Sequence, residues 1–259
     1  MRLHSTPLRY PGGKQKLTPF IREIIETNNL SGGAYVEPYA GGAGVAMDLL
    51  ITGVVSNVYL NDACYPLYCF WRCVIDHPEW LCKRILSASL TVDEWKFQRS
   101  ILKSKTEVDQ KDLGFAMFYL NRCNRSGILT GGLIGGLAQD GEWKMDARFP
   151  RNELIRRIEL IASRSDAIHL SCMDAEDFML TQLIDLSDRS LIYCDPPYYE
   201  KASGLYLNFY NASDHERVAY FIQNNIVIPW IVSYDNAPQI THYYRNNKGF
   251  SYNLQYNAG

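Results

Sequence analysis

The chain has 259 residues, of which 47% are hydrophobic and 21% charged, and its formal net charge at pH 7 is −2. This composition is that of an ordinary globular protein and excludes an intrinsically disordered chain. The charge balance gives no overall attraction to nucleic acid or to a membrane, so any basic surface must be local.

The sequence contains neither a signal-peptide core at its N-terminus nor an apolar run of the roughly 20 residues that span a membrane. Its seven cysteines form no C-x-x-C pair and show no spacing typical of metal ligands. We therefore expect a cytoplasmic protein with reduced thiols, no metal site and no membrane partner, most simply a monomer.

The first feature in chain order is a Gly-Gly turn within residues 9–17, which leads into a helix with apolar positions at residues 17–25. Backbone N–H groups of such a turn can approach an anion, and Lys14 adds a positive charge for a carboxylate or phosphate. A plain surface turn is the alternative interpretation of this signal.

Residues 34–51 then predict a strand, a glycine-rich turn at residues 41–44 and a helix, which is the opening unit of a doubly wound nucleotide-type fold. A second strand at residues 57–61 ends in Asp62, about twenty residues after the glycine turn. A ribose-binding carboxylate occupies this place in such folds, although a helix N-cap explains Asp62 equally well.

The strand–helix alternation then stops, and residues 65–165 read as an inserted, mostly helical unit. Between residues 121 and 164 it carries eight Arg or Lys against five acids. Asp140-Gly141 predicts a β-hairpin. Arg and Asn side chains on a loop beside a hairpin suit DNA phosphates and base edges, and the candidates are Arg122, Asn124, Arg125 and Lys144.

Alternation resumes with strands at residues 167–172, 191–194 and 228–234, helices at 213–224 and 238–244, and a final strand from residue 250. The acids that follow these strands join the glycine turn at one edge of the predicted sheet. They fit an adenosine-like ligand beside a planar second substrate, and they are Asp62, Asp174, Asp195 and Asp235.

Asp195 begins a rigid turn, because Pro196 and Pro197 fix their own φ and bias the preceding residues toward extended geometry. The turn can hold the Asp195 carboxylate and the Pro196 carbonyl in one relation, which suits the two N–H groups of a planar amine. An ordinary Asp-Pro turn is the alternative.

Taken in order, six motifs resemble those of the Dam-type DNA adenine methyltransferases, which use S-adenosylmethionine. The likeness runs from Arg9 to Tyr256. The motifs are Arg-Tyr-Pro-Gly-Gly-Lys at residues 9–14, Glu-Pro-Tyr-Ala-Gly-Gly at 37–42, Asn-Asp at 61–62, Leu-Asn-Arg at 120–122, Asp-Pro-Pro-Tyr at 195–198 and Val-Ser-Tyr-Asp-Asn at 232–236.

The resemblance implies an α/β, doubly wound Rossmann-like methyltransferase sheet, with residues 1–64 and 166–259 as the catalytic domain and 65–165 as the target-recognition region for double-stranded DNA. Asp62 would take the ribose hydroxyls of the cofactor, and Asp174 would approach its adenine. The remaining implied cofactor contacts are Tyr10, Lys14, Glu37, Tyr39, Gly41, Gly42 and Asp195.

The expected activity is site-specific methylation of the N6 amino group of an adenine flipped out of the duplex. Asp195 and the Pro196 carbonyl would accept its two N–H groups, and Tyr198 would stack on the base. Relatives continue past residue 259 with a further strand, so we expect a truncated chain or a sheet closed differently. Two alternatives are a catalytically impaired DNA-binding protein and a methyltransferase for another planar amide or amine.

Overall fold

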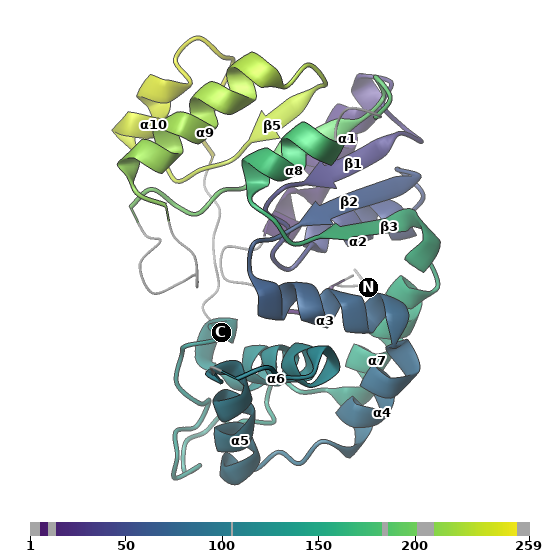
Figure 1. Ribbon diagram of the computed structural model, residues 1–259, viewed down its shortest axis with the longest axis vertical. Helices are drawn as coiled ribbons and strands as arrows, with labels where there is room; N and C mark the ends of the chain where they lie inside the picture. Colours follow the sequence, from purple (N-terminus) through teal and green to yellow (C-terminus); the bar gives the residue numbers. More distant parts are fainter. Residues whose placement is uncertain (1–5, 10–13, 105, 183–185, 201–209, 253–259) are drawn as a thin grey trace.

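The computed structural model describes residues 6–9, 14–104, 106–182, 186–200 and 210–252 (Figure 1). At its centre lies a five-stranded sheet of order β3-β2-β1-β4-β5, in which every pair of neighbours is parallel. This confirms the doubly wound α/β fold. The strands are β1 (Ala34–Glu37), β2 (Asn57–Asn61), β3 (Ile168–Ser171), β4 (Leu191–Cys194) and β5 (Trp230–Val232).

Both faces of the sheet are covered, as the continuous apolar run of β4 requires. Leu191 and Tyr193 point into one core cluster, whereas Ile192 and Cys194 point into a second cluster on the other face. Helices α8 (Ala175–Gln182) and α9 (Ala212–Asn225) supply the second cluster. Helices α1 (Thr18–Thr27) and α2 (Gly44–Ile51) lie on the first face, and α10 (Pro238–Tyr243) packs beside α9 (Figure 1).

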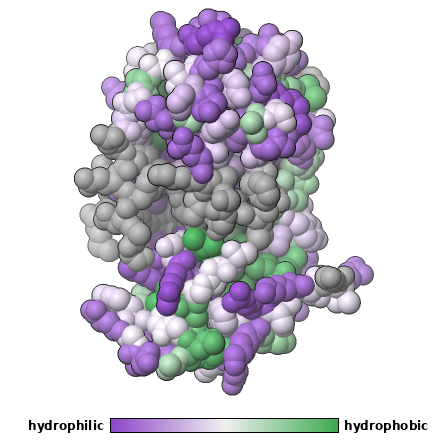
Figure 2. Space-filling model, turned by 90° about the vertical axis from the view of Figure 1, so that its left-hand side faces the viewer, coloured by the Kyte–Doolittle hydropathy of each residue, from purple (hydrophilic) through white to green (hydrophobic). Residues whose placement is uncertain are grey.

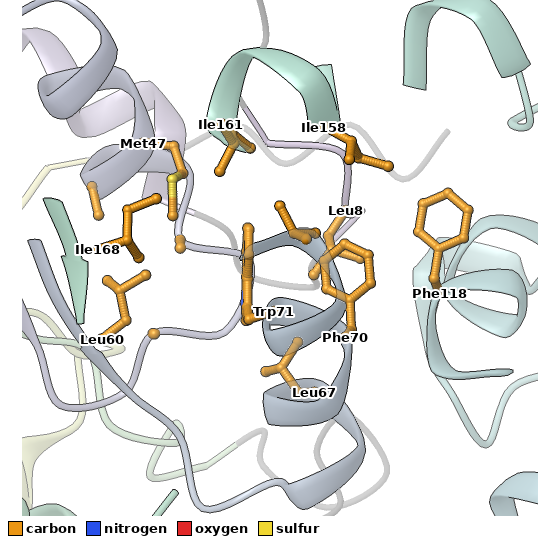
Figure 3. Packing of buried hydrophobic residues seen from close by; sticks show 14 of the residues in the cluster. Leu8, Met47, Leu60, Leu67, Phe70, Trp71, Phe118, Ile158, Ile161 and Ile168 are labelled. Carbon is orange, nitrogen blue, oxygen red and sulfur yellow. The ribbon is translucent and has the colours of Figure 1, made fainter. Parts of the chain in front are cut away.

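The segment between β2 and β3 forms five helices that lie below the sheet in Figure 1. Phe70 and Trp71 connect the sheet to the inserted helices. Figure 3 shows them between Leu60 of β2 and Phe118 of the inserted segment. One core cluster therefore continues across residue 65, where the sequence predicts a boundary. The helices are α3 (Tyr65–Asp76), α4 (Pro78–Ser87), α5 (Val92–Leu102), α6 (Gln110–Cys123) and α7 (Arg151–Ala162).

The predicted hairpin at Asp140-Gly141 is wrong: residues 131–147 form successive turns and no strand, and their one antiparallel bridge joins Leu133 to Asn124 at the end of α6, not across residue 140. The physical reason is Gln139, whose side-chain amide binds the local backbone. Its Nε2 donates to the carbonyls of Ile134 (2.7 Å) and Gly136 (2.6 Å), and its Oε1 accepts from the Met145 N–H (3.0 Å). These backbone groups are then not free to pair across a hairpin.

Strand β5 is shorter than predicted and ends at Val232. Beyond it, Ser233 keeps one backbone bond to Cys194 of β4, while its side chain and that of Asp235 turn to the segment that follows β4. The strand expected from residue 250 is absent from residues 250–252, and the rest of that segment lies outside the described residues. Phe250 instead packs edge-on against Phe20 of α1, with ring centroids 5.2 Å apart. Among the described helices, none is long and apolar enough to cross a membrane.

Candidate active site

A cavity of about 440 Å³ lies at the carboxyl ends of β1, β2 and β4, where the order of strands reverses. Open α/β sheets bind ligands at this position. Helix α6 and the loop that follows it close the cavity from the insertion side with Met117, Asn121 and Leu129. The predicted residues that line it are Lys14, Glu37, Tyr39, Gly41, Gly42, Asp62, Asp174 and Asp195. Tyr10 lies outside the described residues.

Asp62 joins the end of β2 to the glycine turn after β1. Its Oδ2 accepts from the Gly41 N–H (2.9 Å), and its Oδ1 accepts from the Cys64 N–H (2.9 Å). Gly41 has φ 47°, a conformation that favours glycine. Burial raises the pKa of Asp62, and the two N–H groups oppose that shift. A carboxylate held in this way keeps lone pairs for hydroxyl donors, so the cradle fits a ribose.

Asp195 lies at the end of β4 and binds two donors. Lys14 Nζ donates to Oδ1 (2.6 Å) and Oδ2 (2.8 Å), and Ser233 Oγ donates to Oδ1 (2.6 Å). Burial raises the pKa of Asp195, whereas the Lys14 charge lowers it. The same ammonium lies 4.9 Å from the centre of the Tyr198 ring. Lys14 thus presents N–H donors to the acid and to an aromatic face, as an amino-bearing substrate would.

Glu37 is 4% exposed at the end of β1, on the neighbouring strand. Burial raises its pKa to about 8, and the nearby Asp195 charge adds to the rise. The group is therefore a neutral acid at pH 7 and can donate a hydrogen bond. Beyond it, the hydroxyls of Tyr39 and Tyr210 lie 3.1 Å apart and line the same cavity.

Two predicted DNA contacts point inward, which corrects the expectation that they reach DNA from the surface. Arg122 is 7% exposed and donates to the backbone carbonyls of Arg148 and Pro7. Asn124 is fully buried, accepts from Trp95 Nε1 (2.7 Å) and donates to the carbonyls of the following loop. Both residues lie at the end of α6, where unpaired loop carbonyls need donors.

The other two predicted DNA contacts, Arg125 and Lys144, are exposed on the same region. Figure 2 shows hydrophobic and hydrophilic residues interleaved on the half formed by the inserted helices, whereas the described surface of the sheet half is mainly hydrophilic. This mixed surface is compatible with a nucleic-acid contact, because phosphates take cations and bases take apolar or aromatic groups.

Sequence reasoning named Asn121 only within the Leu-Asn-Arg motif and gave it no role, whereas in the structure it connects the N-terminal segment to α6. Its Nδ2 donates to the Arg9 carbonyl (2.7 Å), and its Oδ1 accepts from the Arg9 N–H (2.8 Å). The residue is 1% exposed and lines the cavity. An amide at the end of an apolar helix run was the available signal, because a buried amide must find partners.

Comparison with known proteins gives one positive result. A family model described as D12 class N6 adenine-specific DNA methyltransferase matches residues 10–257. No curated protein matches the chain.

Proposed function

Because the chain belongs to the D12 class N6 adenine-specific DNA methyltransferase family, we propose that it transfers a methyl group from S-adenosylmethionine to the N6 amino group of an adenine flipped out of duplex DNA. One observation carries the proposal beyond the family: the Asp62 cradle and the Asp195 carboxylate open onto one cavity of about 440 Å³. A donor and an acceptor of a methyl group can therefore meet there without crossing solvent.

The residues of the cavity fit the cofactor. Asp62 would take the ribose hydroxyls, Tyr39 and Asp174 would border the adenine, and the glycine turn would follow the methionine part. Neutral Glu37 would offer one hydrogen bond there without adding a second negative charge beside Asp195. When bound, the cofactor supplies an electrophilic methyl group.

The adenine N6 is a weak nucleophile, because its lone pair is delocalised into the ring. Acceptance of one N–H by Asp195 and of the other by the Pro196 carbonyl would let the nitrogen pyramidalise and direct its lone pair at the methyl group. Flipping costs a few kcal/mol of unstacking, and Tyr198 would return about 1 to 3 kcal/mol by stacking on the base. No covalent intermediate with the protein is needed.

Lys14 has two consequences for this chemistry. Its positive charge opposes the rise in the Asp195 pKa and so favours the ionised acceptor. In the present conformation, however, its ammonium donates to both carboxylate oxygens. Oδ1 also accepts from Ser233, so Oδ2 is the oxygen that keeps a lone pair for an adenine N–H, and we propose that entry of the base shifts Lys14 toward the cofactor side.

The decisive experiment replaces Asp195. Asp195→Ala should abolish methyl transfer to DNA, because the main N–H acceptor is lost, while cofactor binding measured by calorimetry weakens without vanishing. A tritiated-methyl assay with sequencing of the modified sites measures activity, base and recognition site together. Asp188→Ala, at an exposed acid in the turn before β4, is the matched control.

Unchanged turnover of Asp195→Ala would contradict the catalytic role proposed for Asp195. Cofactor binding by wild-type protein without methylation of any DNA would instead favour the catalytically impaired DNA-binding alternative. Incorporation of label into protein and not into DNA would favour another planar amide or amine as the substrate.

A further inference from the structure

Three consecutive residues after β5 surround the segment 195–200, which we name the catalytic turn: the first and third bind it directly, and the second binds His215, against which Tyr199 packs. They are Ser233, Tyr234 and Asp235. The acid at the end of this strand has no role in the chemistry above, and neither has Tyr199. The contacts of these residues explain both.

The first contact fixes the beginning of the catalytic turn. The Ser233 N–H donates to the Cys194 carbonyl (2.9 Å), which extends the β4–β5 pairing by one bond. The Ser233 hydroxyl donates to Asp195 Oδ1 (2.6 Å), so the Tyr193 hydroxyl, 2.8 Å away, donates in turn to Ser233. Ser233 thus holds both the backbone carbonyl before Asp195 and one oxygen of the Asp195 carboxylate.

The second contact fixes the end of the catalytic turn. Asp235 Oδ1 accepts from the Tyr199 N–H (2.8 Å), and Oδ2 accepts from the Glu200 N–H (2.9 Å). A carboxylate that binds two successive backbone N–H groups forms a pair of charge-assisted hydrogen bonds, which are stronger than neutral ones. Both oxygens of Asp235 face the backbone of the turn.

The third contact fixes the side of the catalytic turn. The Tyr234 hydroxyl lies 3.1 Å from Nδ1 of His215, a residue of α9 that is 1% exposed. The ring of Tyr199 lies 5.1 Å from the same imidazole, centre to centre. Tyr199 therefore packs against His215 of α9, which Tyr234 binds from the other element. Its ring serves this packing, whereas the ring of Tyr198 is the one proposed to stack on the base.

We propose that Asp235 is a positioning residue that holds the second hydrogen-bond acceptor and the stacking ring of the catalytic turn in place. Between the two anchored ends lie Pro196, Pro197 and Tyr198, and the two prolines have a fixed φ. With both ends held by residues 233–235, the Pro196 carbonyl and the Tyr198 ring have little freedom. Without Asp235, Ser233 still holds Asp195, whereas residues 196–200 lose the two hydrogen bonds that anchor their far end.

The test compares Asp235→Ala and Asp235→Asn with Glu216→Gln, a control that removes one exposed carboxylate from α9. Amide hydrogen exchange at Tyr199 and Glu200 reports the clamp directly. We expect protected amides in wild type and in the control, fast exchange in the alanine variant and an intermediate rate in the asparagine variant, which retains one acceptor.

Turnover then tests positioning, and this arm rests on the proposed function. Asp235→Ala should lower kcat about 100-fold, the effect of a displacement near 1 Å in a catalytic group. The dissociation constant for the cofactor should stay near that of wild type, because the cofactor contacts outside the turn are untouched, whereas DNA binding should weaken as far as Tyr198 stacking contributes to it. A merely structural defect would change kcat and cofactor binding together. The asparagine variant should recover part of kcat.

Each outcome decides something distinct. Equal exchange in wild type and Asp235→Ala would overturn the clamp, and an unchanged kcat in a protein that methylates DNA would overturn the positioning role. If wild-type protein methylates no DNA, the proposed function fails, while the exchange measurement still supports or refutes the clamp.

Discussion

At the scale of single residues, Glu37 and Asp195 are two carboxyl groups in one buried site, where Lys14 is the ammonium that the described residues bring to Asp195. Burial raises the pKa of both acids, and each charge would raise the pKa of the other. Lys14 contacts Asp195 and so compensates only that acid. The neutral state of Glu37 is the simplest way for the site to avoid a second uncompensated charge.

Glu37 gives a prediction on stability. The native pKa of about 8 exceeds the ordinary value of 4.5, so between these pH values the native state holds a proton that the unfolded state releases. The free energy of unfolding must therefore fall as pH rises through this window, by at most roughly 5 kcal/mol. Glu37→Gln removes the titration. Denaturant unfolding of wild type and variant should agree best near pH 4.5 and diverge toward pH 8, with the variant more stable; parallel curves would contradict the shift.

Individual site residues were predictable where they follow a strand. Asp62, Asp174 and Asp195 line the cavity because carboxyl ends of parallel strands share one edge. Arg122 and Asn124 were misjudged because residue type says nothing about direction: both side chains satisfy buried carbonyls. Arginine and asparagine side chains can donate hydrogen bonds to DNA, but they can equally donate to buried backbone carbonyls that have no other partner.

At the scale of elements, α3 and α6 approach closely at Gly114. A Cβ built there would lie 2.7 Å from the Cys69 carbonyl oxygen, a backbone atom that cannot move aside. Beside this point, the rings of Phe70 and Phe118 stack at 5.5 Å between the two helices. Gly114 therefore sets the distance between α3 and α6.

Gly114→Ala should destabilise the protein. Alanine gains about 1 kcal/mol of helix propensity over glycine, whereas forcing an atom into a packed interface costs typically 1 to 3 kcal/mol, and here the clash is with backbone. We expect a net loss of about 1 to 2 kcal/mol by denaturant unfolding. Gly249→Ala, where an added Cβ meets nothing within 4 Å, is the control. A variant as stable as wild type would show that α3 and α6 separate at little cost.

Elements were predicted well where a hydrophobic period covers several turns, as in α1 and α9. The hairpin at residue 140 failed because one side chain, Gln139, competes with strand pairing for the backbone. The end of β5 was misjudged for a related reason, since the side chains of Ser233 and Asp235 bind the catalytic turn. Short-range patterns do not contain such long-range partners.

At the scale of the whole molecule, the inserted helices and the sheet share one hydrophobic core. The alternation of strands and helices was enough to predict the fold class, because few other arrangements bury parallel strands on both faces. The continuity of the core was not predictable, since the apolar face of a helix does not reveal which neighbour covers it. The proposed regions for DNA recognition and for catalysis therefore belong to one packed body.

The overall charge of −2 requires that DNA binding depend on local cations. We expect the double substitution Arg125→Gln and Lys144→Gln to weaken DNA binding and to reduce the slope of log affinity against log salt by about 2, near one unit for each lost phosphate contact. Fluorescence anisotropy across a salt series measures both. Arg156→Gln, at an exposed arginine paired with Glu153 on α7, is the control. An unchanged slope would show that neither Arg125 nor Lys144 contacts a DNA phosphate.

The brevity of β5 has a consequence for folding accuracy. Only three residues pair it with β4, through Trp230, Ile231 and Val232. A slip by a single residue would exchange the two faces of the strand and bring Tyr234, in place of Ser233, opposite the acid. Three apolar side chains that do not line the cavity thus set the register on which the position of Ser233 depends. One inserted or deleted residue in β5 should therefore leave the far-ultraviolet circular dichroism unchanged and abolish turnover.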